Sequence, residues 1–150
     1  GIGYDIGYLR YQYPGGGDFN TNEIYGVLSY KGFSGSVNYT NELKFVGSEE
    51  SGWYWKGAFD HEFQYEIGFS AHIGYSTGDA FDMDAIDALS GDSGLGDSYT
   101  DWSIGLSKSV YGVDLGLTYT DLSDIEFQDG TDCNDDWCDS KVVFSISKSL

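Results

Sequence analysis

The sequence is short of several residue types, and each shortage excludes a class of protein. It has 7 Lys and Arg against 25 Asp and Glu, giving a formal net charge of −18. Nucleic acid is bound through clustered basic side chains, so it is not an expected partner. No long uninterrupted apolar run occurs, and a transmembrane helix needs roughly 20 such residues. The single proline and the aromatic fraction of 17% argue against a proline-rich linker and against disorder.

The hydrophobic pattern repeats every two residues along most of the chain, which indicates β-strands. In residues 33–40, for example, Phe33, Val37 and Tyr39 alternate with Ser, Asn and Thr side chains. The successive side chains of a strand point to opposite faces, so each strand has one apolar face and one small or polar face. The pattern predicts eight strands, at residues 2–13, 23–31, 33–41, 53–63, 65–76, 100–109, 111–121 and 141–150.

The lengths of the connections between these strands distinguish two architectures. The connections at residues 31–32, 64–65 and 110–112 are tight, whereas the other four are long. Strict alternation of short and long connections is typical of an antiparallel up-and-down transmembrane β-barrel, with its apolar faces toward lipid and its polar faces toward the lumen. A soluble secreted β-sandwich, with the apolar faces as its core, is the rival interpretation.

Two further features bear on the barrel. Aromatic residues near the strand ends fall where girdles meet the lipid headgroups: Tyr30, Tyr39, Trp53, Tyr75, Trp102, Tyr111 and Tyr119. The first strand fits less well, because its apolar residues change face between Tyr8 and Leu9. We therefore expect a β-bulge there, or an extension of the strand beyond the membrane.

Four ordered blocks resemble a known family: "YDIGYLRYQYPG" at 4–15, "NEIYGVLSY" at 22–30, "YTDWSIGLSKSVYGVDLGLTYTD" at 99–121 and "KVVFSISKSL" at 141–150. They are similar to the TorF family of porins, the Gcw_chp domain of proteobacterial outer-membrane proteins. The resemblance implies a single barrel domain over residues 1–150, equivalent to the C-terminal two-thirds of such a protein. A signal peptide and N-terminal strands would then be missing, and the whole barrel would have roughly 12 strands. The final Leu150 departs from the Phe that usually ends such barrels.

Charged residues of the predicted polar faces would line the lumen: Lys56, Asp60, Glu62, Glu66, His72, Asp101 and Asp114. They could form an acid-lined passage that favours cations. Alternatively, Lys56 pairs with a neighbouring carboxylate, and the other residues are hydrated or form a network that plugs the lumen.

Two long connections are strongly acidic. They carry thirteen carboxylates, which would set a negative potential at the mouth of a barrel: Asp79, Asp82, Asp84, Asp87, Asp92, Asp97, Asp124, Glu126, Asp129, Asp132, Asp135, Asp136 and Asp139. "DMDAID" and "NDDWCD" offer oxygen ligands for a weak Ca²⁺ site, namely Asp82, Asp84, Asp87, Asp132, Asp135 and Asp136. Neither has the glycine and final glutamate of an EF-hand loop, and diffuse binding of divalent cations is the alternative.

Cys133 and Cys138 lie in the second acidic connection. No second Cys or His pair accompanies them as a zinc site would require, so in an exported protein we expect a disulfide. His61 and His72 lie on strands distant from these cysteines. No G-x-S-x-G turn occurs, so we expect no enzyme and no cofactor beyond loosely bound divalent cations.

These observations lead to one functional prediction and one alternative. We expect a porin of the Gram-negative bacterial outer membrane through which small solutes, with a preference for cations, diffuse passively. The alternative is a non-conducting barrel whose acidic external loops bind cations, lipopolysaccharide or a protein partner. The expected partners are outer-membrane lipid and lipopolysaccharide, small solutes, and either further copies of the chain or another outer-membrane protein.

Overall fold

The computed structural model describes residues 1–15, 19–42, 49–81, 98–123 and 139–148. These residues form one antiparallel sheet in which the strands follow one another in chain order. The strands are β1 (Ile2–Tyr11), β2 (Thr21–Tyr30), β3 (Phe33–Thr40), β4 (Gly52–Phe63), β5 (Ile67–Thr77), β6 (Ser98–Val110), β7 (Val113–Ser123) and β8 (Lys141–Ser147). A short 3-10 helix, η3 (Asp79–Phe81), follows β5. Among the described residues, no helix has the length and apolar character needed to cross a membrane.

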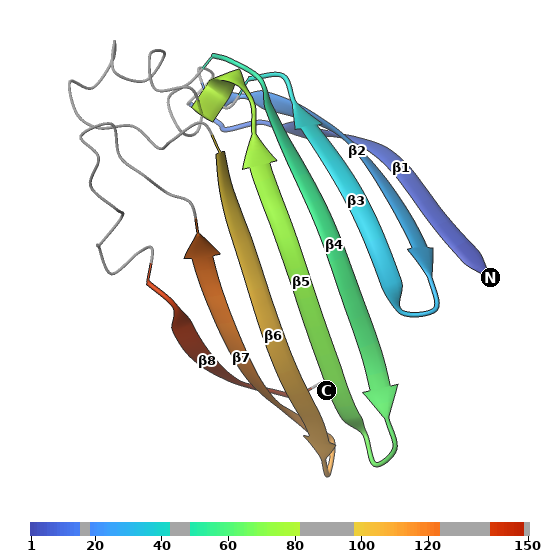
Figure 1. The fold of residues 1–150 in the computed structure, drawn as a ribbon. Coiled ribbons are helices and arrows are strands. Elements are labelled where there is room, and N and C mark those ends of the chain that lie inside the picture. The colour runs from blue at the N-terminus through green and yellow to red at the C-terminus, as the bar shows by residue number, and fades with distance from the viewer. Residues whose placement is uncertain (16–18, 43–48, 82–97, 124–138, 149–150) are drawn as a thin grey trace.

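The predicted strands and connections are confirmed, with small shifts at their ends. Two connections are two-residue hairpins, Lys31-Gly32 and Tyr111-Gly112, and all four residues have positive φ. This is the backbone of a type I′ turn, whose twist matches that of the flanking strands. The start of β1 and the end of β8 both lie at the end of the sheet where the short turns are (Figure 1).

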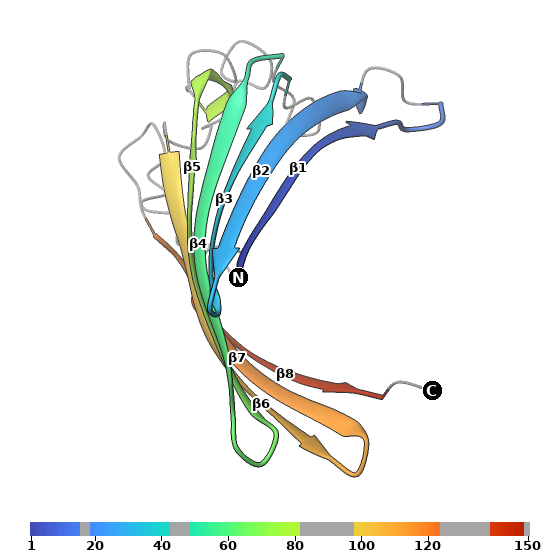
Figure 2. The same ribbon diagram turned by 90° about the vertical axis from the view of Figure 1, so that its right-hand side faces the viewer.

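The sheet is curved but open. Its β1 and β8 edges bend toward the same side and remain apart (Figure 2). In the described part of the chain, β1 pairs with β2 and β8 pairs with β7, and β1 does not pair with β8. The all-β antiparallel class is therefore confirmed, whereas a closed barrel is not what this sheet forms by itself.

Two predictions about individual residues or strands are wrong, the bulge in β1 and the place of Glu66. The pairing of β1 with β2 is continuous from Ile2↔Tyr30 to Tyr11↔Thr21, so β1 has no bulge, while its extension beyond the membrane stays a prediction. Leu9 therefore shares the polar face, opposite Glu23. Glu66 was expected on the polar face of a strand, but it lies in the turn before β5 with φ of 57°. Glu66 is instead the last residue of the three-residue connection between Phe63 and Ile67.

Candidate functional site: the polar face of the sheet

The two faces of the sheet have the reverse of the accessibility expected for a water-soluble sheet. On the apolar face, Ile6 is 78% exposed, Phe144 67% and Ile73 59%. On the polar face, Ser76 is 3% and Ser103 9% exposed. Among the described residues, Ala80 is the only apolar residue that is buried, and it lies outside the strands. The sheet therefore has no hydrophobic core of its own.

Small residues crowd the polar face. An added Cβ at Gly3 would be 2.6 Å from Ser29 Oγ, and one at Gly105 would be 2.6 Å from Ser70 Oγ. Glycines of the apolar face have ordinary space, with the nearest atom 3.9 Å from a Cβ at Gly57. Side chains converge on the concave side of a curved sheet, so we infer that the polar face is the concave one (Figure 2).

Four side chains in the middle of the polar face form a hydrogen-bonded group, called here the His72 cluster: Tyr54, His72, Asp101 and Ser103. His72 in β5 lies directly opposite Ser103 in β6. Ser103 Oγ is 2.8 Å from His72 Nδ1, and His72 Nε2 is 2.9 Å from Asp101 Oδ1. The Tyr54 hydroxyl donates to the same Asp101 oxygen at 3.2 Å. An ionised carboxylate only accepts, so Nε2 carries a proton toward Asp101, and in a neutral ring Nδ1 then accepts from Ser103.

The geometry of the His72 cluster also shows what it lacks. The second carboxylate oxygen of Asp101 is buried without a hydrogen-bond partner among the described residues. Ser103, His72 and Asp101 are hydrogen-bonded in the order Ser–His–Asp, as in the catalytic triads of hydrolases. Ser103, however, is only 9% exposed. The strand that carries Ser103 is paired on both sides, which commits its backbone N–H groups to the sheet rather than to an oxyanion. The arrangement therefore favours Asp101 as a fixed negative charge over Ser103 as a nucleophile.

A second pair repeats part of this arrangement near the β1 edge. The Tyr25 hydroxyl donates to Asp5 Oδ2 at 3.2 Å, and the Tyr25 ring lies over Gly7. Closer to the long connections, the Asn38 amide donates to Glu23 at 2.9 Å. The polar face is therefore connected by side-chain hydrogen bonds between neighbouring strands.

The structure separates the other residues predicted to line a lumen. Lys56 is half-buried in the middle of the polar face, whereas Asp60 and Glu62 are exposed toward the short-turn end. Asp114, the second residue of β7, lies at that same end and accepts a hydrogen bond from Ser109. No carboxylate of a described residue lies within ion-pair distance of Lys56. The expected salt bridge of Lys56 is therefore absent from this part of the chain.

The proposed metal and disulfide residues cannot be placed. Asp82, Asp84, Asp87, Asp132, Asp135 and Asp136, together with Cys133 and Cys138, lie outside the described residues. Within the described ranges, no group of three or more His, Cys, Asp or Glu side chains could hold a metal ion. Asp79 and Asp139 are described, and both are exposed.

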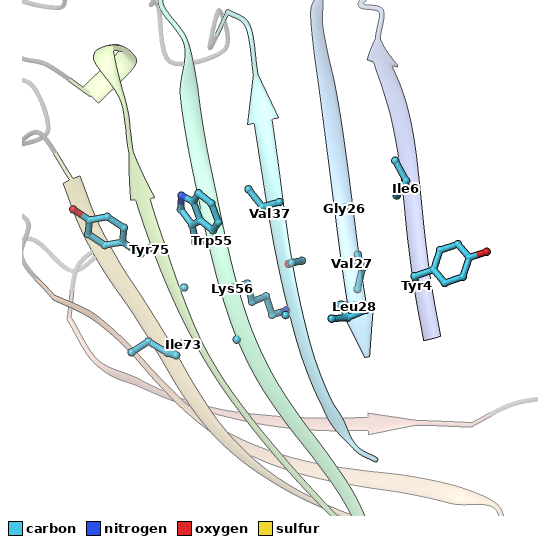
Figure 3. A pocket seen from close by; sticks show the side chains of 14 residues that line it. Tyr4, Ile6, Gly26, Val27, Leu28, Val37, Trp55, Lys56, Ile73 and Tyr75 are labelled. Carbon is cyan, nitrogen blue, oxygen red and sulfur yellow. The ribbon is translucent and has the colours of Figure 1, made fainter. Parts of the chain in front are cut away.

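The apolar face carries a separate feature, an open hollow of about 780 Å³ across β1 to β5. Gly26, Gly35 and Gly57 leave this space because they have no side chains. Figure 3 shows Trp55 of β4 and Ile6 of β1 on opposite sides of it. The hollow is thus a gap between large apolar side chains, on the opposite face from the His72 cluster.

Sequence reasoning missed several residues of the polar face: Asp5, Glu23, Tyr25 and Ser103. Tyr54 was assigned to this face, but its hydrogen bond to Asp101 was not predicted. The two-residue turn at Lys31-Gly32 fixes the register of β2 and β3, so the pairing of Tyr25 with Asn38 could have been predicted from it. No short turn connects β5 with β6, so the pairing of His72 with Ser103 had no such signal.

Comparison with known proteins gives one match. The model of the Gcw_chp family, described as a bacterial protein of unknown function, matches residues 1–150. No curated protein and no solved structure is significantly similar to the chain. The match confirms the Gcw_chp part of the resemblance and leaves the link to TorF porins as a prediction. The chain belongs to the Gcw_chp family of bacterial proteins.

Proposed function

We propose that the chain forms part of the wall of an outer-membrane β-barrel, related to the TorF porins, through which small solutes diffuse passively. The observation that carries this proposal is the reversed accessibility of the two faces. Ile2, Ile6 and Phe144 are each more than 60% exposed, while polar residues such as Ser76 are buried. Exposing so much contiguous apolar surface to water is unfavourable, whereas lipid would cover it.

The aromatic residues of the apolar face support the same orientation. Tyr39 and Trp53 pack at a ring distance of 4.6 Å, and Trp102 and Tyr119 pack at 5.3 Å. These pairs lie in the halves of their strands that lead to the long connections. At the short-turn end, Phe33 and Phe59 pack at 4.5 Å. Two aromatic groups at opposite ends of an apolar band are typical of a transmembrane barrel.

A passage requires a closed ring that is wider than these eight strands. An eight-stranded barrel has an interior that its own side chains fill, whereas roughly 12 or more strands leave room for water. Since β1 and β8 are both edges of the open sheet, further strands could pair with both. The concave face would then line the passage, and the net charge of −18 would favour cations.

A second candidate function follows from the crowding of the polar face. Gly3, Gly7, Gly74, Gly105 and Gly116 are each overlain by side chains of neighbouring strands. If the ring closes with a filled interior, the barrel does not conduct. Its acidic external connections would then be the functional part and would bind divalent cations, lipopolysaccharide or a protein partner.

The proposal includes a compartment and partners. The protein would reside in the outer membrane of a Gram-negative bacterium, in contact with lipid and lipopolysaccharide. It would catalyse no reaction and hold no cofactor other than loosely bound divalent cations. We propose further copies of the chain, or another outer-membrane protein, as its assembly partners.

Reconstitution of the chain into planar lipid bilayers, together with the strands that would close the ring, tests the passage directly. We expect discrete current steps and a reversal potential that indicates preference for potassium over chloride. Membrane insertion without current steps would favour the non-conducting barrel. Stable behaviour in detergent-free buffer, as a monomer, would contradict both candidates and favour the soluble sandwich.

A further inference from the structure

One cross-strand row of the polar face carries three charged residues. Following direct partners from β1 to β6, the row runs through Asp5, Val27, Ser36, Lys56, Gly74 and Asp101. Lys56 therefore lies between the two carboxylates, with the small residues Ser36 and Gly74 as its direct neighbours. The charges along the row alternate as negative, positive and negative.

Asp101 differs from the other carboxylates of the polar face in how it is held. His72 and Tyr54 both donate to its Oδ1, at 2.9 Å and 3.2 Å. The Asp101 side chain is only 20% exposed, whereas Asp5 and Asp60 are exposed residues. A charge that is fixed and partly removed from water acts more strongly on a passing ion, because it is less screened.

We propose that Asp101 is the carboxylate that sets the cation preference of the passage. The inference rests on the proposed function and names the group that would select the solute. The selected class is small cations. Tyr54 and His72 act as positioning residues, since they hold the Asp101 carboxylate toward the concave side of the sheet.

Reversal potentials in a potassium chloride gradient test the role of Asp101. The chain is reconstituted together with the strands that would close the ring. We expect Asp101→Asn to lower the potassium-to-chloride permeability ratio by roughly two- to fivefold, because a weakly screened charge is lost. Asp60→Asn is the matched control, since it removes the same charge from an exposed position of the same face. Equal effects of the two substitutions, or no effect of Asp101→Asn, would overturn the inference.

The second arm uses His72→Gln, which keeps a side chain able to donate to Asp101. The permeability ratio of this variant should stay close to that of the wild type, whereas Asp101→Asn lowers it. A ratio for His72→Gln as low as that for Asp101→Asn would count against the positioning role of His72. Insertion without any wild-type current would overturn the passage itself, and this inference with it.

Discussion

The side chain of Tyr54 in β4 lies directly over the backbone of Gly74 in β5. A Cβ at Gly74 would overlap both the Tyr54 hydroxyl and the buried oxygen of Asp101. The hydrogen bond between Tyr54 and Asp101 therefore depends on the absence of a side chain at position 74. Gly57, on the neighbouring strand, faces the other way and has room for a Cβ.

Gly74→Ala should destabilise the sheet. Tyr54 and Asp101 would have to move, and forcing an extra carbon into a packed site costs about 1–3 kcal/mol. Gly57→Ala is the matched control and should change the free energy of unfolding by less than about 1 kcal/mol. Urea unfolding of both variants in lipid vesicles, followed by tryptophan fluorescence, measures the difference. Equal losses in the two variants would mean that the contact over Gly74 is not formed.

The two short hairpins offer a second comparison. Gly32 and Gly112 have φ of 87° and 75°, in the left-handed region that strains most other residues. A Cβ at Gly32 would also overlap the carbonyl oxygen of Asp60, whereas nothing lies within 4 Å of one at Gly112. Gly112→Ala should therefore cost only the backbone strain, about 1–2 kcal/mol. Gly32→Ala should cost more, and the same unfolding assay would expose the prediction as wrong if Gly112→Ala were the worse variant.

The strands and the short hairpins could be predicted because their signals are local. Alternation assigns Val37 and Ser36 to opposite faces, and the Lys31-Gly32 turn fixes which β3 residue faces each β2 residue. The expected bulge in β1 was wrong for an instructive reason. Leu9 and Tyr11 are apolar residues that lie on the polar face, at the edge of the sheet. Their hydrophobicity alone predicts the apolar face, so the pattern indicated a change of face that the strand does not make.

The His72 cluster could not be predicted because its pairing crosses a long connection. His72 and Asp101 are 29 residues apart, and no short turn links β5 with β6. Only the completed sheet shows that Ser103 faces His72. The same limit explains why His72 and Asp101 were both predicted on the polar face while their contact with each other and with Ser103 was not.

Substitutions at Ile104 test whether lipid covers the apolar face. This residue lies in β6 between Ala71 and Tyr119 and is 46% exposed. Ile104→Lys should lower the stability of the vesicle-inserted protein by about 2–4 kcal/mol, since a lysine on a lipid-facing strand is costly near the middle of the bilayer. Ile104→Val is the control and should cost about 0.5–1.5 kcal/mol. A lysine variant as stable as the valine variant would place this face in water.

The edges β1 and β8 decide whether the ring has eight strands or more, and disulfide cross-linking can distinguish these cases. In a background with Cys133→Ser and Cys138→Ser, Tyr4→Cys combined with Leu28→Cys is the positive control, since Tyr4 and Leu28 are direct partners in β1 and β2.

We expect this control to form a disulfide in the membrane. Pairs that combine Tyr4→Cys or Ile6→Cys in β1 with Val142→Cys or Phe144→Cys in β8 should remain reduced. The two edges do not pair in the sheet, and cysteines whose Cα atoms are more than about 7 Å apart cannot be bridged. Non-reducing electrophoresis with mass spectrometry of the linked peptides reports the outcome. An efficient link within one chain would mean a closed eight-stranded barrel. Its side chains would fill the interior, so the link would contradict the passage and favour the non-conducting barrel.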